Sequence, residues 1–502
     1  MSDELLQQLT TLTADVIDLR RASALLEWDE QVHMPPGGAA VHAEMVATIR
    51  KVAHEKFTAD EVGRLLERLQ PAIDDGAIDP DAARLVRLTA REFDKATRVP
   101  SSFVAELAQV ESAAQHAWAD ARARSDFAAF RPHLERIVEL KRRYVSFFPP
   151  AVHPYDILLD DFEPGTTTAE VKAVFDQLRP RQVALVAALR ERPQVDDAFL
   201  RAAYPQGPLW DFGAEVVSKM GFDWTRGRQD RSVHPFATAI GPDDVRITTR
   251  FVEAQPLAVL FGTMHEAGHA LYEQGLTLAR GRTLVGEAVS LGFHESQSRL
   301  WENMVGRSRA FWEHFYPQLQ GRVPGQLADV PLERFYRGIN KVQPSLVRVE
   351  ADEATYNLHV MLRVELELGL IEGTLAVADL PELWRVRMRE YLGIVPETDA
   401  EGVLQDIHWA IGAIGYFATY TLGNLISAQL WDRFGEQQPD RDAQIARGEF
   451  APLLDWLREH VHRHGRRFEP RALLERIVGR GVDPDPYLRY LEQKYGEIYG
   501  LS

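Results

Sequence analysis

Apolar residues recur at steps of three and four over most of the chain, which is the spacing of one face of an α-helix. Breaks rich in Pro and Gly, such as 34–38, 147–156 and 204–207, separate these runs. Strand signals are few, and the best is "DVRITTRFV" at 244–252, where β-branched residues alternate after a Gly-Pro turn. In the first half of the chain the periodicity predicts helices over 4–27, 39–70, 80–97, 101–124, 126–146, 168–191 and 209–220.

This order of elements predicts an all-α fold with a small antiparallel sheet. No linker, low-complexity tract or internal repeat interrupts it, so residues 1–502 are expected to form a single domain. Residues 409–431 carry no charge over 23 positions, a length that could span a membrane. The segment contains Thr, Asn, Ser, Gln and Tyr, and no second such segment exists, so we interpret it as a buried helix near a cleft.

A further helix is predicted over 256–274, with Pro256 in its first turn and Gly275 just past its end. It contains the stretch "HEAGH" at 265–269. His265 and His269 are four residues apart, so both rings leave one face and can meet a single ion. Glu266 lies about 100° round the helix, where it can reach a water on that ion. Gly268 is expected to keep the surface between the histidines low enough to admit a ligand.

A catalytic zinc ion needs a third protein ligand. Glu295, on a second predicted helix within 292–304, is the best candidate because it would complete a His₂Glu set and leave one position open. Glu287 is a rival, Glu273 is a weaker one, and His294 could replace Glu295, although adjacent helical residues cannot both face the metal. Another histidine pair, at 460 and 464 within the basic stretch 458–468, is interpreted as a solvated or structural face.

Composition limits the possible partners, metal ligands and location of the protein. The 502 residues include 74 acidic and 57 basic ones, and the net charge of −17 argues against nucleic acid or an anionic membrane as the main partner. There is no cysteine, so a metal must be coordinated by His, Asp and Glu side chains. The first ten residues have neither a basic nor an apolar signal region, which makes the cytoplasm the expected location.

Two later stretches carry polar residues at helical spacing. Over 347–367 a predicted helix would align Arg348, Asp352, Thr355 or Tyr356, His359 and Arg363 in one line, which we expect to face a cleft. Residues 402–424 supply a mainly apolar segment with a few polar groups, as ligand sites have. There Asp406 could orient His408, and a tyrosine, Tyr416 or Tyr420, could donate to an oxyanion.

Six short motifs stand in order along the chain: "HPF" at 234–236, "DVRIT" at 244–248, "HEAGH" at 265–269, "HESQ" at 294–297, "VRVEAD" at 347–352 and "GVLQDIHW" at 402–409. Together with the beginning (27–45) and end (490–500), they resemble the carboxypeptidase Taq family of zinc metallocarboxypeptidases over nearly the whole chain. The resemblance implies a nearly all-helical fold with a deep groove, similar to the angiotensin-converting enzyme and neurolysin type. It also implies a homodimer that removes C-terminal residues with broad specificity.

Carried over residue by residue, the resemblance makes His265, His269 and Glu295 the zinc ligands and Glu266 the general base that activates the metal-bound water. Cobalt could substitute for zinc in such a site. Arg348 and Arg246 are the candidates for holding the terminal carboxylate of a peptide, and Tyr416 and Asp352 are further substrate-binding candidates.

Tyr420 or His408 is expected to stabilise the oxyanion, so both are candidate catalytic residues. Two other functions stay open at this point. An oligopeptidase that cuts internal bonds needs the same metal set, and a helical peptide-binding protein could hold zinc in a closed structural site.

Overall fold

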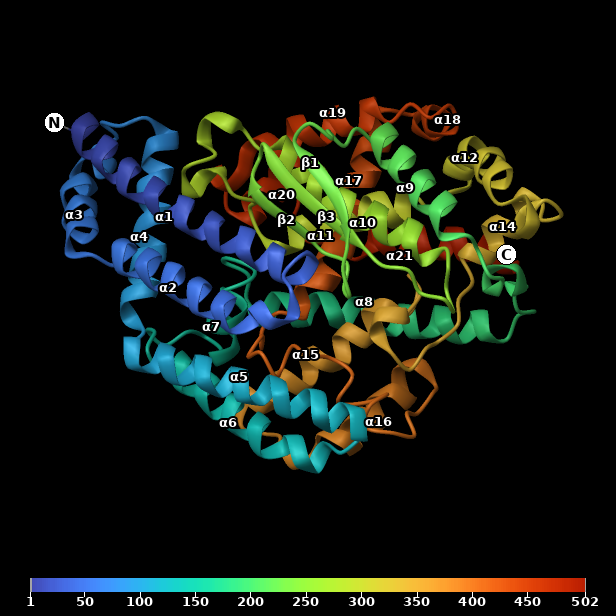
Figure 1. Cartoon of the computed structure of the whole chain (residues 1–502), viewed down its shortest axis with the longest axis horizontal. Coiled ribbons are helices and arrows are strands. Elements are labelled where there is room, and N and C mark those ends of the chain that lie inside the picture. Colours follow the sequence, from blue (N-terminus) through green and yellow to red (C-terminus); the bar gives the residue numbers. More distant parts are fainter. Residues whose placement is uncertain (1, 502) are drawn as a thin grey trace.

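A computed structural model of the chain describes residues 2–501. Its first half consists of helices joined by short turns (Figure 1). The predicted helix 39–70 is two helices, because the chain is extended at Ala59 and a new helix starts with Asp60 and Glu61, acidic residues that suit a helix N-terminus. These helices are α1 (Ser2–Val32), α2 (Ala39–Phe57), α3 (Asp60–Asp74), α4 (Pro80–Arg98), α5 (Ser101–Arg124), α6 (Phe127–Val145), α7 (Pro154–Leu159), α8 (Thr168–Arg190) and α9 (Gln206–Met220).

The second half is also helical. Helix α10 begins at Ala258 after Leu257, so Pro256 lies just outside it and Gly275 is its last residue. The helices are α10 (Ala258–Gly275), α11 (Leu291–Arg299), the π-helical turn η5 (Leu300–Val305), α12 (Arg309–Arg322), α13 (Pro324–Leu327), α14 (Leu332–Ile339), α15 (Tyr356–Glu372), α16 (Leu380–Leu392), α17 (Ala418–Gln437), α18 (Arg441–Ala446), α19 (Ala451–His460), α20 (Pro470–Val478) and α21 (Asp485–Tyr499).

A three-stranded sheet lies between α9 and α10, with strand order β1-β3-β2. The strands are β1 (Gly227–Arg231), β2 (Ala237–Gly241) and β3 (Asp244–Thr249). The prediction of an antiparallel sheet is correct for β2 and β3 but wrong for β1, which pairs with β3 in parallel. Strand β1, "GRQDR", has no β-branched residue, so local sequence gave no sign of it. Val245 and Ile247 of β3 are fully buried in the large core that the sheet shares with α10.

Two predicted helices begin later than their sequences suggested. Over 347–367 only a short 3-10 turn at 348–350 precedes α15, which starts at Tyr356. Over 409–431 the helix α17 starts at Ala418, because Gly412 and Gly415 adopt φ of +67° and +101° and interrupt the chain before it. Among the residues described, none of the helices combines the length and apolarity that a membrane crossing requires.

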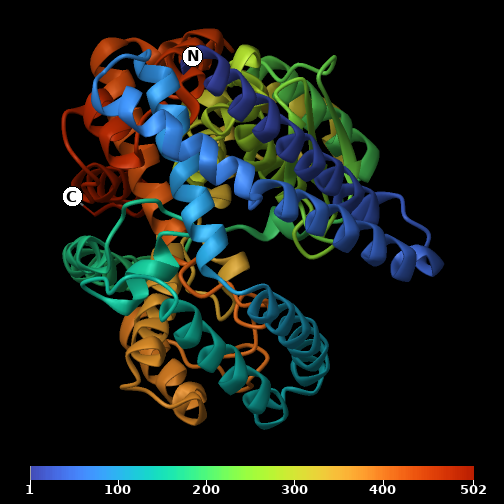
Figure 2. The ribbon, with the colours of Figure 1, turned by 90° about the vertical axis from the view of Figure 1, so that its left-hand side faces the viewer.

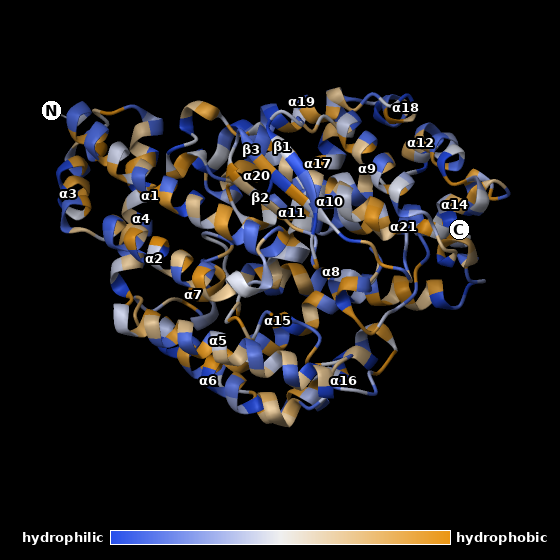
Figure 3. Ribbon diagram, in the orientation of Figure 1, coloured by the Kyte–Doolittle hydropathy of each residue, from blue (hydrophilic) through white to orange (hydrophobic). Residues whose placement is uncertain are grey.

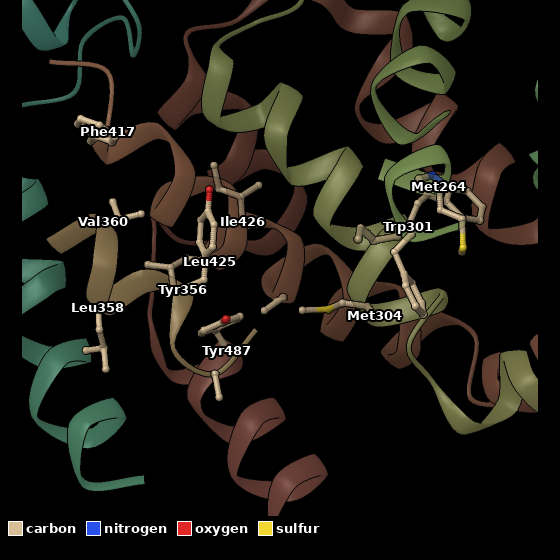
Figure 4. Close-up of a cluster of buried hydrophobic side chains, with 14 of the residues drawn as sticks. Met264, Trp301, Met304, Tyr356, Leu358, Val360, Phe417, Leu425, Ile426 and Tyr487 are labelled. Carbon is tan, nitrogen blue, oxygen red and sulfur yellow. The ribbon is translucent and has the colours of Figure 1, made fainter. Parts of the chain in front are cut away.

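The core is formed by helices from distant parts of the sequence. Figure 4 shows Met264 of α10 beside Trp301 and Met304 of η5, with Leu425 and Ile426 of α17 and Tyr356 of α15 nearby. The outer helices α1 to α4 alternate hydrophobic and hydrophilic residues along their length (Figure 3), as helices with one solvated face do. Helices α5 and α6 gather with α15 and α16 at one end of the molecule, and α4 leads into that end (Figure 2).

Candidate metal centre and active site

Helix α10 presents His265 and His269 from one face towards Glu295 of α11. The Nε2 atoms of His265 and His269 lie 3.7 Å and 3.5 Å from Oε2 of Glu295. One nitrogen from each histidine and one carboxylate oxygen fall within 4.8 Å of one another, and in residues 2–501 this is the group that could hold a metal ion. The i, i+4 spacing on α10 therefore brings the two rings together as expected.

Neighbouring side chains orient two of the three candidate ligands, Glu295 and His265. Arg299 donates from Nε to Oε1 of Glu295 at 2.7 Å, which leaves Oε2 of that carboxylate towards the histidines. On the other side, Nδ1 of His265 lies 2.9 Å from Oε2 of Glu302, a residue of the π-helical turn η5. A carboxylate on one ring nitrogen orients the imidazole so that the other nitrogen can bind a metal.

Two glycines let the helices approach closely enough to form this group. A Cβ on Gly268 would lie 2.6 Å from Cα of Ser298, and one on Gly423 of α17 would lie 2.6 Å from Cγ of Glu295. The interpretation that Gly268 makes room for a ligand is therefore wrong: the space is filled by the backbone of α11. Both glycines instead allow α10, α11 and α17 to meet at the site.

The rival ligands are bound elsewhere. Glu273 lies 2.9 Å from Nε2 of His294, whose ring stacks on that of His269 with centroids 4.5 Å apart. Glu287 pairs with Arg466 at 3.0 Å. Of the second histidine pair, His460 stacks on Trp456, and its Nδ1 lies 2.9 Å from the carbonyl of that residue.

Burial sets the charges of the site. It raises the pKa of Glu266, which is 6% exposed, to about 7. It lowers the pKa of His269 to about 3, so that this ring is neutral and its nitrogen lone pair is free to bind a metal. Burial alone would raise the pKa of Glu295, but Arg299 and the two histidines outweigh it and hold that pKa well below its usual range.

A wall of aromatic side chains adjoins the candidate ligands, because Arg299 lies over the ring of Tyr356 at 4.3 Å and that ring is 6.0 Å from the ring of Tyr420. Nε2 of His408 lies 3.2 Å from the hydroxyl of Tyr420, whose ring is 5.3 Å from that of Tyr416. Burial raises the pKa of Tyr420 well above its usual value, so this hydroxyl remains a hydrogen-bond donor. Burial lowers the pKa of His408 to about 4, which leaves that ring neutral at neutral pH.

Next to this wall, two arginines share one carboxylate. Arg348 donates to Oδ1 of Asp406 from Nε at 3.0 Å and from Nη2 at 2.9 Å, and Arg363 donates to Oδ2 at 2.7 Å. The guanidinium of Arg348 also lies over the ring of Tyr420, 4.8 Å from its centroid. All three charged side chains are at most 10% exposed, so positive charge is locally in excess in a buried cluster.

Two residues predicted to bind substrate are engaged elsewhere in the structure. Asp352 accepts hydrogen bonds from the backbone N–H groups of Gln343, Ala354 and Thr355, and it ties the chain down just before α15. The carboxylate that holds Arg348 is that of Asp406 and not that of Asp352. Arg246 pairs with Asp244 and lies over the ring of Trp28 at 4.3 Å.

The site borders a polar cavity of about 180 Å³ whose walls include Arg299, Glu302 and Tyr356. A more open cavity of about 400 Å³ shares Arg307 and Lys341 with it, so the two adjoin. This space therefore lies beside Arg299 and Glu302, the residues that orient Glu295 and His265.

These side chains fit a catalytic divalent metal. Two imidazole nitrogens and one carboxylate oxygen converge, and three protein ligands with a carboxylate beside them are the donor set of a hydrolytic zinc site. A helical fold with such a site on the motif H-E-x-x-H defines the class of metallopeptidases.

Comparison with known proteins agrees with that class. Residues 8–495 match the sequence profile of the family described as "Carboxypeptidase Taq (M32) metallopeptidase". The chain is 42% identical to thermostable carboxypeptidase 1 of Thermus thermophilus, covering 98% of this chain and 99% of the relative, and 38% identical to carboxypeptidase 1 of Bacillus subtilis, covering 96% of each. The crystal structure of the M32 carboxypeptidase from Deinococcus radiodurans superimposes with a TM-score of 0.96 at 42% identity, over 99% of this chain and 100% of that one.

The chain therefore belongs to the carboxypeptidase Taq (M32) family of metallopeptidases. It is a metallocarboxypeptidase, a peptide hydrolase that depends on a divalent metal ion. The resemblance inferred from the six motifs is confirmed, and so is the predominantly helical fold.

Sequence reasoning missed Arg299 and Glu302, which orient the candidate ligands. A signal was present, because Glu295, Arg299 and Glu302 are spaced i, i+4 and i+7 and so share one helical face. The π-helical turn that carries Glu302 is not visible in the sequence, although such turns are frequent at functional sites.

Proposed function

We propose that this protein is a zinc carboxypeptidase that removes C-terminal residues from peptides with broad specificity. The observation that carries the proposal is the convergence of His265, His269 and Glu295 within 4.8 Å, with the buried Glu266 next to them. Three protein ligands leave a coordination position open, which suits catalysis and not a closed structural site.

The chemistry follows from the side chains around this centre. A divalent metal held by the three ligands would supply the positive charge that polarises the scissile carbonyl and acidifies the attacking water. Glu266 accepts the proton of that water and then passes it to the leaving amine. Nε2 of His408 lies 3.2 Å from the Tyr420 hydroxyl, so a neutral His408 protonated on Nε2 would donate to that oxygen and leave the Tyr420 O–H free to donate to the oxyanion.

The buried cluster of Arg348, Arg363 and Asp406 supports an exopeptidase. Two guanidinium groups against one carboxylate leave positive charge that a substrate's terminal carboxylate can neutralise. Arg348 is the better placed of the two, because Arg363 is fully buried and Arg348 lies over Tyr420. Two of the five N–H groups of its guanidinium remain for a ligand after its bonds to Asp406 and Tyr356.

A test compares peptides that differ only at the C-terminus. The enzyme, loaded with zinc, is incubated with a free-acid peptide and its amide, and fragments are followed over time by mass spectrometry. Sequential loss of single residues from the acid, with little cleavage of the amide, is the expected result. Internal fragments from both peptides would favour an oligopeptidase, and no cleavage by enzyme with a full metal content would contradict catalysis altogether.

Zinc as the metal and a homodimer as the assembly also belong to this proposal. The N, N, O donor set suits zinc and also accepts cobalt, so activity regained by chelated enzyme should be compared for the two ions. The homodimer is inferred from the family resemblance, and a mass of twice 56.8 kDa by light scattering is expected.

A further inference from the structure

An irregular segment, residues 407–417, carries two side chains of the proposed site, His408 and Tyr416. It has no regular secondary structure of its own and contains Gly412 and Gly415, both with positive φ. A segment of this kind keeps its shape only if other parts of the molecule hold it.

Glu367 of α15 contacts this segment at two points. Its Oε1 accepts a hydrogen bond from Nε1 of Trp409 at 2.8 Å, and its Oε2 accepts one from the backbone N–H of Gly415 at 3.0 Å. A third bond, at 2.6 Å, comes from the hydroxyl of Tyr155 on α7. Glu367 is fully buried, and no cation lies within ion-pair distance of it in the described residues.

One helical turn earlier on α15, Arg363 holds the two residues just before this segment. It donates to Asp406 at 2.7 Å and to Oε1 of Gln405 at 2.6 Å. Residues i and i+4 on one helix often pair with each other, yet Arg363 bonds the residues before the segment and Glu367 bonds the segment itself. Helix α15 therefore fastens the chain on both sides of His408, by Arg363 before it and by Glu367 after it.

We propose that Glu367 is a positioning residue for catalysis, which fixes the 407–417 segment so that His408 and Tyr416 keep their places beside Tyr420. This inference rests on the proposed function of His408, Tyr416 and Tyr420. A carboxylate without a counter-ion is a costly way to fill a core, and burial raises the pKa of Glu367 to about 7. Its three donors explain why a carboxylate stands there, because no other side chain accepts from all of them at once.

The test replaces Glu367 by Gln, which has the same shape but brings an N–H₂ group against at least one of the three donors. The matched control is Glu365→Gln on the same helix, because Glu365 pairs with Arg179 and Tyr391 away from the segment. For the metal-loaded proteins we would measure zinc content, kcat, KM and hydrogen exchange of residues 407–417.

For Glu367→Gln, kcat should fall on the order of 10²-fold, as for a misplacement of about 1 Å, while KM changes less and zinc stays bound. Exchange in 407–417 should rise, and Glu365→Gln should match the wild type. Adding Trp409→Phe to Glu367→Gln removes the donor that opposes the new amide, so part of the lost activity and protection should return.

Unchanged kcat and exchange in Glu367→Gln would overturn the inference, as would a lowered melting temperature with normal kcat for the folded enzyme. If Glu367→Gln does not fold, Trp409→Phe alone provides the answer, because it removes one tie without burying a new donor. Normal exchange and kcat in that variant would contradict the proposal. A wild-type enzyme that releases no C-terminal residue would instead contradict the proposed function, whatever the exchange shows.

Discussion

Glu266 is the residue whose replacement separates metal binding from proton transfer. Glu266→Gln removes the proton acceptor but none of the three ligands, so zinc should remain while kcat falls by at least about 10³-fold, the range for loss of a general base. Glu273→Gln, on the same helix and paired with His294, is the control for removing a charge near the site. The measurements are zinc content by elemental analysis and turnover of a free-acid peptide. Near-normal turnover with zinc present would refute the role of Glu266 as general base.

Arg348 can be tested without unfolding its cluster, because Arg363 would still neutralise Asp406 after the side chain is lost. For free-acid peptides, Arg348→Ala should lower kcat/KM by an amount that corresponds to about 2–5 kcal/mol of lost transition-state stabilisation. Truncation of one partner in a buried charge pair has a cost of this size. Discrimination against the amidated peptide should shrink, and zinc content should stay the same. A variant that still rejects amides as strongly as the wild type would show that another cation holds the carboxylate.

At the scale of elements, the first turn of α11 is hydrogen-bonded to a buried carboxyl group. Glu163, 2% exposed, accepts the backbone N–H of Gly292 close to Glu295 on the same helix. Burial raises the pKa of Glu163 to about 7, although hydrogen bonds from Ser290 and Gly292 act against the rise. The folded protein therefore keeps this proton up to about pH 7, whereas the unfolded chain releases it near pH 4.5. Between these values stability contributed by Glu163 falls as pH rises.

Glu163→Gln should abolish that dependence. At pH 5 the wild-type carboxyl is protonated and similar to an amide, so the two proteins should have nearly equal free energies of unfolding. At pH 8.5 the wild type must bury a carboxylate, and the variant should be more stable by about 1–3 kcal/mol. Denaturant unfolding at both pH values measures the difference. If the free energies of unfolding of the two proteins differ by the same amount at pH 5 and pH 8.5, Glu163 is already ionised at pH 5 in the folded protein.

At the scale of the whole molecule, Arg466 joins the C-terminal part of the chain to α4 and to the segment just before α11. Its guanidinium pairs with Glu92 of α4 at 2.7 Å and with Glu287 at 3.0 Å, and it is 13% exposed. Arg466→Ala should lower the free energy of unfolding by about 1–3 kcal/mol, less than for a fully buried pair because both carboxylates are partly solvated. Hydrogen exchange should increase in α4 more than in α10. If α4 is as well protected from exchange in Arg466→Ala as in the wild type, apolar packing alone holds the N-terminal helices.

Much of the fold could be predicted because helices repeat a local pattern. The apolar periodicity located α4, α5, α6 and α8 to within a few residues, and the pair His265 and His269 required only the geometry of one helix. Periodicity failed where contacts distant in sequence decide the backbone. Just before α17 begins, the N–H of Gly415 donates to Glu367, 48 residues away, and strand β1 is formed by its pairing with β3.

The sequence by itself determined the helical fold, the metal-binding motif on α10 and the family, because these depend on residue spacing and on motifs that stand in order. Only the tertiary structure decided which carboxylates serve which partner. Glu295 meets the histidines because Gly268 and Gly423 let three helices approach, while Glu273 and Glu287 are bound elsewhere. The tertiary structure also decided that Asp406 pairs with both Arg348 and Arg363. Partners of charged groups are set by distances across the fold, and no local pattern in the chain encodes those distances.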